Sequence, residues 1–233
     1  MRVLAVIPAR GGSKRFPRKN VAPFLGRPIL AYTVEAARAS GCFERVILST
    51  DDQDIAAAGR EAGAMIHDRP AELATDTARA ADVCAHLLKE EERLGRDFDV
   101  VCCLFPTAPL RGAGDIRAVV NLVVPGVHDY AMAVTGFHYP AWQALKPGED
   151  GALHPMFPEI IDKSSQAVGP LYVDNGSTYA VTARVMRRDK TFNGPAIRGH
   201  VMPRERSVDI DLPEDLELAE FYAAKTGIAA QDE

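Results

Sequence analysis

Short runs of apolar residues alternate along the chain with longer segments whose apolar residues recur every three or four positions. The short runs predict strands, which we place at 3–7, 45–50, 64–67, 99–104 and 130–135. The longer segments predict helices, which we place at 28–40, 52–63, 75–94 and 113–123. Boundary signals support these limits: Pro28 lies in a first turn, Asp52 and either Thr75 or Asp76 can act as N-caps, and Gly63 stops a helix.

Strands that alternate with helices predict a three-layer α/β fold, a mostly parallel sheet with helices on both faces. The run at 3–7 is apolar on both faces, as expected of a central parallel strand. The alternation stops at residue 137, and residues 137–173 are rich in Pro, Gly, Asp and Lys, so we expect an inserted flap. Strands at 178–181 and 197–202 and a helix at 213–225 complete a single domain over residues 1–233.

Composition and charge narrow the class of protein. Hydrophobic residues make up 47% and charged residues 25% of the chain, as in soluble globular proteins. The net charge of -5 argues against general nucleic-acid binding. No apolar stretch approaches the ~20 residues of a membrane span, and the N-terminal apolar run is too short for a signal peptide. We expect a cytoplasmic protein that binds neither nucleic acid nor membrane.

The four cysteines predict no metal centre, because the sequence contains neither a CxxC pair nor a Cys/His cluster. A zinc site is therefore not expected. Cys102 and Cys103 lie in the apolar run at 99–104, which predicts buried strand positions in a reducing compartment.

A basic loop at 8–20, Pro-Ala-Arg-Gly-Gly-Ser-Lys-Arg-Phe-Pro-Arg-Lys-Asn, follows the first strand. Parallel sheets bind ligands beyond the carboxyl ends of their strands, and Gly11 and Gly12 allow close approach of the backbone. Five cations of the loop together suit a triphosphate: Arg10, Lys14, Arg15, Arg18 and Lys19. The loop is neither a P-loop nor a dinucleotide fingerprint. The alternative is a solvated basic loop.

Asp209 and Asp211 predict a metal site. They are two positions apart, so in an extended segment both side chains face one way and can share a hard cation such as Mg²⁺. The alternative for Asp211 is capping of the last helix, because Pro213 follows two positions later.

The 8–20 loop resembles the signature of the nucleotide-sugar cytidylyltransferases, which is close to IPARGGSKxxPxKN. Three more segments resemble motifs of that family, and the resemblance covers nearly the whole chain: 49–52, 69–76 and 208–215. It implies the glycosyltransferase-A-like fold of nucleotide-diphospho-sugar transferases. It also implies Mg²⁺-dependent transfer of a cytidylyl group from CTP to an acidic sugar, with release of pyrophosphate. The family further implies a homodimer in which residues 137–173 reach the partner subunit.

By position, the resemblance assigns Arg10 and Lys19 to the CTP phosphates, with Lys19 near the α-phosphate, and Asp209 and Asp211 to Mg²⁺. Nucleotidyl transfer mainly needs positioning and neutralisation of charge on the phosphates, so Arg10, Lys19 and Asp211 are the catalytic candidates. Other positions would support the phosphates or, for the last two, lie near the cytidine: Ala9, Gly11, Gly12, Ser13, Asn20 and Arg69.

The segment at 104–111 resembles the QPTSPLR motif of CMP-sialic acid synthetases, with Phe105 in place of Gln. An aromatic residue there is more similar to the pseudaminic acid cytidylyltransferases, as are 137–140 and 144–146, whereas 174–179 departs from that subgroup. We favour a nine-carbon α-keto acid sugar, pseudaminic acid first and legionaminic or sialic acid next. The rivals are a 3-deoxy-manno-octulosonate cytidylyltransferase and a catalytically silent nucleotide-binding module.

Four side chains are candidates for sugar binding. Arg111 or Lys146 would meet the sugar carboxylate, unless each is an exposed surface charge. Phe105 and Tyr179 would pack on apolar groups of the sugar, unless they are buried in the core. His138 is a candidate general base, and the alternative is a loop histidine bonded locally.

Overall fold

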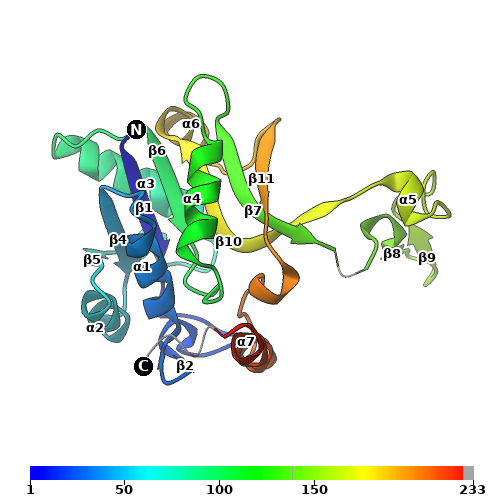
Figure 1. Ribbon diagram of the computed structural model, residues 1–233, viewed down its shortest axis with the longest axis horizontal. Helices are drawn as coiled ribbons and strands as arrows, with labels where there is room; N and C mark the ends of the chain where they lie inside the picture. The colour runs from blue at the N-terminus through cyan, green and yellow to red at the C-terminus, as the bar shows by residue number, and fades with distance from the viewer. Residues whose placement is uncertain (138, 228–233) are drawn as a thin grey trace.

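The computed structural model describes residues 1–137 and 139–227. Its centre is a seven-stranded sheet that is parallel except for β10, which runs antiparallel to both neighbours (Figure 1). The mostly parallel sheet predicted from the sequence is confirmed. From edge to edge the strands are β11 (Ile197–Val201), β7 (Tyr130–Gly136), β10 (Tyr172–Thr182), β6 (Val100–Leu104), β1 (Val3–Pro8), β4 (Arg45–Thr50) and β5 (Met65–Asp68).

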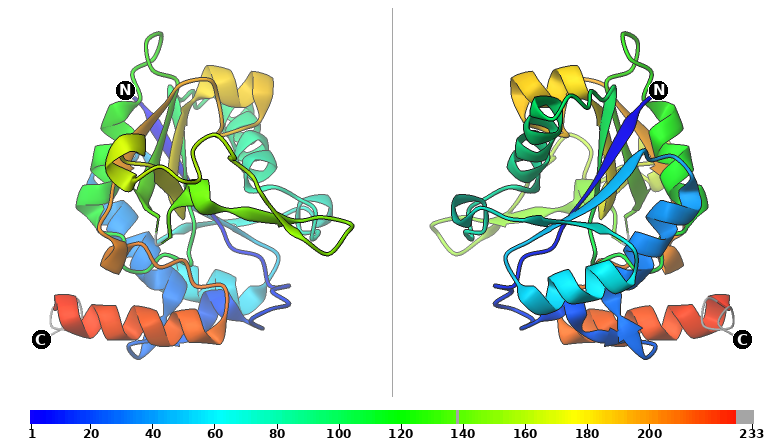
Figure 2. Two further views of the ribbon diagram at one scale, coloured as in Figure 1. Left: turned by 90° about the vertical axis from the view of Figure 1, so that its right-hand side faces the viewer. Right: turned by 90° about the vertical axis from the view of Figure 1, so that its left-hand side faces the viewer.

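Helices cover both faces of the sheet, which gives the expected three layers (Figure 2). One layer contains α1 (Ile29–Ser40), α2 (Gln53–Glu61) and α4 (Ala113–Leu122), and the other contains α3 (Ala80–Arg93) and α6 (Ala183–Asp189). Side chains of β1 alternate between the layers, as strand geometry requires. Val3, Ala5 and Ile7 pack with α1 and α4, whereas Leu4 and Val6 pack with α3. This two-sided burial explains the uniformly apolar run in the sequence.

One helical prediction needs correction, and one helix was missed. The helix expected to be capped by Thr75 or Asp76 begins later, at Ala80, because bends and turns occupy residues 74–77 after the 3-10 turn η2 (Ala71–Leu73). Asp82 then accepts hydrogen bonds from the main chain and the guanidinium of Arg79, which starts α3. Helix α6 was not predicted, since it is short and follows β10 directly.

The inserted flap is an arm that extends away from the sheet (Figure 1). Its described part is more regular than its composition suggests and contains η3 (Ala141–Gln143), a hairpin of β8 (Leu145–Pro147) and β9 (Leu153–Pro155), and α5 (Ser165–Val168). Strand β10 starts in this arm, at Tyr172 rather than at 178, and its pairing with β7 is irregular between Asp174 and Tyr179.

A third apolar cluster joins the last helix, α7 (Pro213–Thr226), to the chain that follows the basic loop. Phe24 and Ile29 pack there with Ala219 and Ala223. The short elements around it are η1 (Lys19–Val21), β2 (Pro23–Phe24), β3 (Arg27–Pro28) and η4 (Arg204–Arg206). The packing brings the segment before α7 to the loop after β1.

The cysteine prediction is confirmed for β6, where Cys102 and Cys103 are buried and free. Among the described residues, no helix has the length and apolarity that a membrane crossing requires.

Candidate active site

One pocket lies at the carboxyl ends of β1, β5 and β6, where a parallel α/β sheet is expected to bind ligands. Its volume is about 250 Å³. The basic loop, the residues after β6, the start of α3 and the segment before α7 form its walls. Five cationic side chains and two carboxylates line it: Arg10, Lys14, Arg15, Lys19, Arg69, Asp209 and Asp211.

The basic loop is held by the end of β4. The amide of Ala9 donates to Ser49 O (3.0 Å) and the amide of Gly11 donates to Asp51 Oδ1 (2.9 Å). A Cβ on Gly11 would lie 2.8 Å from Asp52 Oδ2 and 2.9 Å from Asp52 Cβ, so a larger residue would displace the N-cap of α2. Two amides that we expected to support phosphates are therefore already paired in the free protein.

Lys19 and Arg15 both contact Asp211. Lys19 Nζ lies 2.7 Å from Asp211 Oδ1, and Arg15 Nη2 lies 2.6 Å from Oδ2. The Lys19 side chain is only 15% exposed, whereas that of Arg15 is 68% exposed. Burial tends to raise the pKa of Asp211, but the hydrogen bonds and charges of the two cations outweigh it and hold this pKa below its ordinary value. Asp211 is therefore an ionised carboxylate that fixes Lys19 in the pocket.

Asp209 lines the same pocket without a cation partner among the described residues. Its carboxylate accepts a hydrogen bond from the hydroxyl of Thr107. Desolvation by the surrounding protein, together with the charge of Asp211, raises the pKa of Asp209 above its ordinary value. A Cβ on Gly176 would lie 2.6 Å from Asp209 Oδ2, so β10 also approaches this carboxylate closely. The result is a desolvated carboxylate on which the charges of Asp211 and Lys19 act in opposite directions.

Asp215, rather than Asp211, caps α7. Its Oδ2 accepts hydrogen bonds from the amides of Asp211 (2.9 Å) and Leu212 (2.8 Å). The capping alternative for Asp211 is thereby ruled out, and its side chain is available to the pocket together with that of Asp209.

A third carboxylate holds two further cations of the basic loop. Asp76 Oδ1 lies 2.7 Å from Arg10 Nη1, and Asp76 Oδ2 lies 2.5 Å from Lys14 Nζ. Hydrogen bonds from Lys14 and Arg10 hold the pKa of Asp76 below its ordinary value. The Lys14 side chain is exposed, so these pairs are weak enough to exchange for another anion.

Asn20 and Arg69 complete the pocket, each fixed by backbone oxygens. Asn20 is buried and its Nδ2 donates to Arg10 O (2.9 Å), which supports the basic loop from beneath. Arg69 Nη2 donates to Ser49 O (2.7 Å), and desolvation lowers the pKa of its guanidinium. Of the remaining predicted loop positions, Ser13 lines the pocket and Gly12 does not.

Phe105 and Tyr179 form an aromatic edge beside the pocket. Phe105 lines it, and the Tyr179 ring meets the Phe105 ring edge-on with the centroids 5.6 Å apart. The Tyr179 hydroxyl donates to the Asp174 carboxylate at 2.7 Å. Burial and then the charge of Asp174 raise the pKa of Tyr179, so this hydroxyl remains protonated.

The structure does not bring the two predicted sugar-binding cations to this pocket. Arg111 is only 2% exposed, and its guanidinium donates to Ser177 O (2.6 Å) and Thr33 Oγ1 (2.6 Å). It is neither an exposed charge nor a pocket residue, because the chain folds back over it after β6. Lys146 is exposed on β8 of the arm. His138 lies outside the described residues.

Sequence reasoning missed three residues that organise the site. Thr107 was present in the 104–111 motif, but its bond to Asp209 depends on a contact between distant segments. Asp76 was considered as a helix cap and as the end of the 69–76 motif, but not as a partner of the basic loop. Asp174 was noted only as a departure from a motif, and no local signal marked it as the partner of Tyr179.

Comparison with known proteins identifies the family of the chain. A family model described as cytidylyltransferase matches residues 4–123, just over half of the chain. A pseudaminic acid cytidylyltransferase of Campylobacter jejuni subsp. jejuni serotype O:2 is 35% identical over 225 residues, which are 95% of this chain and 96% of that protein. A CMP-N,N'-diacetyllegionaminic acid synthase of Legionella pneumophila subsp. pneumophila is 34% identical over 224 residues, or 94% and 95% of the two chains.

A solved CMP:2-keto-3-deoxy-manno-octonic acid synthetase complexed with CTP resembles this structure with a TM-score of 0.72. The match covers 97% of this chain and 100% of that one at 17% sequence identity, so it concerns the fold alone. It confirms the predicted fold class. The family match and the two relatives lead to one conclusion: the chain belongs to the cytidylyltransferase family.

Proposed function

We propose that this protein transfers a cytidylyl group from CTP to a nine-carbon α-keto acid sugar, pseudaminic acid first, and releases pyrophosphate. The observation that carries the proposal is the pairing of Lys19 with Asp211 inside a pocket of basic side chains. The identity of 35% with a relative named for pseudaminic acid supports this acceptor. Legionaminic acid and sialic acid are the next candidates, because a relative named for legionaminic acid is nearly as similar.

In this proposal the cations of the basic loop bind the phosphates of CTP. Arg10 and Lys14 exchange Asp76 for phosphate oxygens, because a phosphate offers a guanidinium two acceptors and carries more charge. Lys19 is nearly buried and held in place, so it can neutralise charge at the α-phosphate without reorganising. Arg69 and Asn20, both tied to backbone oxygens, form a rigid wall for the cytidine.

We further propose that Asp209 and Asp211 hold Mg²⁺. Carboxylate oxygens are the ligands that Mg²⁺ prefers, and Asp209, whose pKa is raised mainly by desolvation, lines the pocket beside Asp211. When bound, the ion would neutralise phosphate charge and orient the reacting oxygens. Thr107 would keep Asp209 oriented through its hydroxyl, and Lys19 would keep Asp211 ionised.

The acceptor side of the site would require a second copy of the chain. The arm carries Lys146 away from the pocket of its own subunit (Figure 1). We propose a homodimer in which this arm reaches the partner's pocket and supplies Lys146 to the sugar carboxylate. Phe105 and Tyr179 would then pack against apolar groups of the sugar.

The test is release of pyrophosphate from CTP and Mg²⁺ with pseudaminic, legionaminic, N-acetylneuraminic and 3-deoxy-manno-octulosonic acids in turn. We expect release with a nine-carbon acid, fastest with pseudaminic acid. Release with the octulosonic acid alone would keep the chemistry and contradict the acceptor. CTP binding without release for any acid would favour the silent nucleotide-binding module.

The same assay tests the role of Lys19. Lys19→Ala should retain CTP binding, measured by titration calorimetry, and lose turnover by about a hundredfold or more, the size of effect seen when one group that neutralises transition-state charge is removed. Lys225→Ala, which removes a lysine at the end of α7, should leave turnover unchanged. Equal turnover in Lys19→Ala and the wild type would remove Lys19 from the mechanism.

A further inference from the structure

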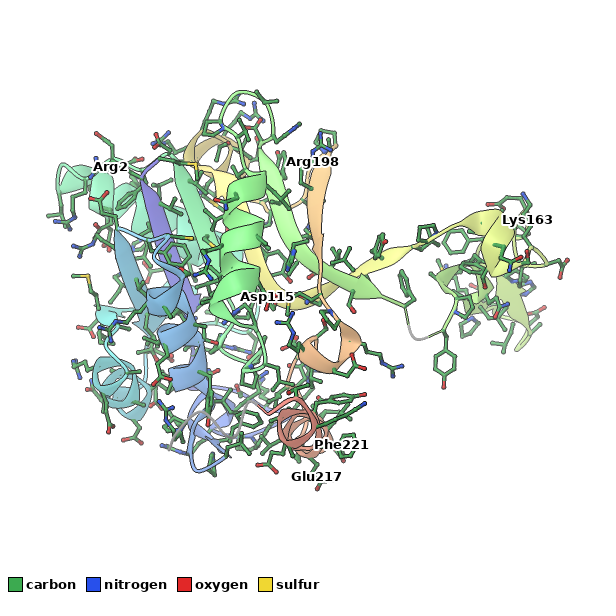
Figure 3. All side chains as sticks on the ribbon, in the orientation of Figure 1. Arg2, Asp115, Lys163, Arg198, Glu217 and Phe221 are labelled. Carbon is green, nitrogen blue, oxygen red and sulfur yellow. The ribbon has the colours of Figure 1, made fainter. Side chains whose placement is uncertain are left out.

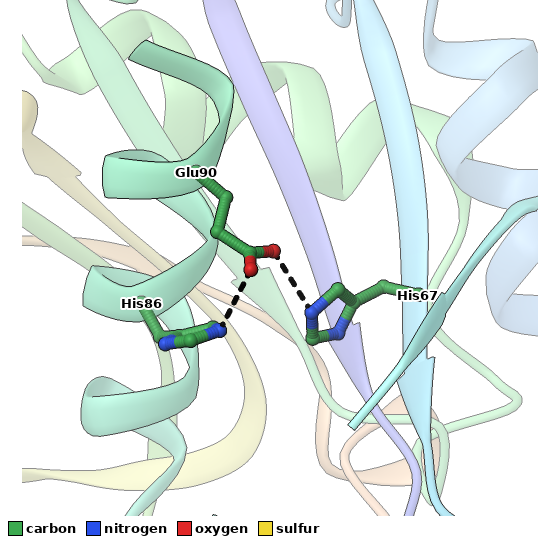
Figure 4. A group of neighbouring side chains, drawn as sticks. All are labelled: His67, His86 and Glu90. Atoms are coloured by element: carbon green, nitrogen blue, oxygen red, sulfur yellow. Dashed lines mark ion pairs between the residues drawn. The ribbon is translucent and has the colours of Figure 1, made fainter. Parts of the chain in front are cut away.

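A cluster of two histidines and a glutamate lies between β5 and α3, outside the pocket described above (Figure 4). His67 comes from β5, and His86 and Glu90 lie one turn apart on α3. Their three ligand atoms all lie within 4.8 Å of one another. His67 Nε2 is 3.0 Å from Glu90 Oε2, and His86 Nε2 is 3.2 Å from Glu90 Oε1.

These separations suit a transition metal. In a tetrahedral zinc site, with bonds of about 2.0–2.1 Å, neighbouring ligand atoms lie roughly 3.4 Å apart. Each imidazole lies within a few tenths of an ångström of that value from one carboxylate oxygen of Glu90, His67 from Oε2 and His86 from Oε1. Two imidazoles and one carboxylate are also a ligand set in which zinc keeps a fourth position open. Small side-chain movements would therefore suffice to accommodate an ion.

The surroundings of the two histidines favour a role as metal ligands over simple ion pairs with Glu90. His86 Nε2 is buried and makes no hydrogen bond of acceptable geometry within the described part of the chain, although it faces Glu90. The His67 side chain is only 13% exposed. Desolvation lowers the pKa of His67, and the charges of His86 and Arg69 act in the same direction against the pull of Glu90.

His67 also has the outer partner that a metal-binding histidine needs. Its Nδ1 lies 3.0 Å from Ser49 Oγ, which leaves Nε2 directed at Glu90. Such a hydrogen bond fixes the ring orientation. Ser49 Oγ in turn accepts a hydrogen bond from Arg69 Nε at 3.3 Å. The cluster is therefore connected, through one hydroxyl, to a cation of the nucleotide pocket.

We propose that His67, His86 and Glu90 bind one divalent transition-metal ion of the zinc class, with a water molecule in the fourth position. The ion would join the edge strand β5 to α3. Both elements contribute to the pocket, since Arg69 follows β5 and Ala80 and Val83 lie in the first turns of α3. Bound metal would therefore hold Arg69 in place relative to α3.

The site is tested with Co²⁺ as a spectroscopic probe for zinc, on the full chain without an affinity tag and in excess Mg²⁺. The excess Mg²⁺ would occupy the site proposed at Asp209 and Asp211, and any Co²⁺ bound there would be octahedral and weakly coloured. We expect intense tetrahedral visible bands that saturate at one Co²⁺ per chain and disappear when Zn²⁺ is added. His86→Ala and Glu90→Gln should each weaken Co²⁺ binding by at least about tenfold.

His154→Ala is the matched control, because His154 also faces a carboxylate, Asp150 Oδ1 at 3.3 Å, but has no second imidazole in its pair. It should bind Co²⁺ as the wild type does. Glu90→Gln preserves side-chain shape, so its far-ultraviolet circular dichroism should match that of the wild type. The proposal is overturned if tetrahedral bands are absent, or if His86→Ala and Glu90→Gln bind Co²⁺ as tightly as the wild type.

Discussion

At the scale of single residues, Arg111 is the side chain whose role changes most between sequence and structure. It is the largest fully buried side chain among the described residues. Its guanidinium joins α1 to the end of β6 and the middle of β10 through Thr33, Phe105 O and Ser177 O. Burial lowers its pKa to about 10, so it remains charged at neutral pH. Arg111 is therefore part of the support beneath Phe105 rather than a ligand for the sugar.

Truncating Arg111 should destabilise the protein. Arg111→Ala leaves a cavity and removes the hydrogen bonds of the guanidinium, so we expect the free energy of unfolding to fall by about 3–5 kcal/mol in urea denaturation. Arg111→Met keeps most of the volume and should cost about 1–2 kcal/mol, since Ser177 O still accepts from the Phe105 amide. Arg117→Ala, which removes only two long hydrogen bonds at 3.3 Å, is the control and should cost less than about 1 kcal/mol.

The same Arg111→Met variant distinguishes a role of Arg111 in supporting Phe105 from a role in binding the sugar. If Arg111 only supports Phe105, the KM for the acidic sugar should change little in the folded variant. A large rise in that KM, with an unchanged KM for CTP, would instead indicate that Arg111 binds the sugar carboxylate.

At the scale of elements, Asp115 joins α4 to β11 and to η4 (Figure 3). It is only 5% exposed and accepts hydrogen bonds from the Gly112 amide, His200 Nε2 and both terminal nitrogens of Arg206. It thus starts the helix and anchors the connection that leads to Asp209. Through these bonds, the buried carboxylate of Asp115 positions a segment of the active site.

Stability should depend on Asp115 in a pH-dependent way. Burial alone would raise its pKa, but hydrogen bonds from Arg206, His200 and Gly112 hold it below the ordinary value of 3.8. Because the folded pKa is depressed, the stabilisation is fully present above the ordinary pKa and is lost as pH falls from there through the folded pKa. Asp115→Asn should lower the free energy of unfolding by about 3 kcal/mol at pH 7.

The loss in Asp115→Asn should shrink as the pH approaches the acid window, measured by urea unfolding at a series of pH values. Asp150→Asn, an exposed carboxylate of the arm, is the control and should change stability by less than about 0.5 kcal/mol at every pH. A pH-independent loss in Asp115→Asn would show that shape, and not charge, accounts for its role.

At the scale of the whole molecule, the arm exposes several large apolar side chains, a feature typical of interaction surfaces. Figure 3 shows the arm, which carries Lys163, extending beyond the helical layers. Leu153 is 61% exposed and Met156 is 55% exposed. Other exposed apolar side chains of the arm are Tyr139, Leu145, Phe157, Leu171 and Tyr172. The arm has little core of its own, which is why we propose that a second subunit covers it.

The dimer predicts how arm variants behave. Leu153→Asp with Met156→Asp should give a monomer in analytical ultracentrifugation, because two charges would be buried in the interface. CTP binding should persist, since the nucleotide pocket lies within one subunit, whereas kcat/KM for the sugar should fall. Leu94→Asp, at the end of α3 and also well exposed, should remain a dimer. An unchanged molecular mass in the double variant would contradict the arm as the interface.

The fold class could be predicted from the sequence because it depends on local periodicity. The continuous apolar run of β1 encodes a strand that is buried on both faces. The spacing of apolar residues in α1 and α4 encodes helices that are buried on one face. The helix missed at 183–189 and the late start of α3 share one cause. Their limits depend on packing and on a side-chain cap, which residue spacing alone does not specify.

The basic loop and the pair Asp209 and Asp211 were recognisable in the sequence because their chemistry is contained in short segments. Only the tertiary structure decided that Lys19 meets Asp211, which lies 192 positions away, and that Arg111 is buried. The tertiary structure alone places His67 beside His86 and Glu90. The physical reason is that composition and periodicity determine which face of an element is apolar, whereas the path of the chain through the sheet determines which polar side chains meet.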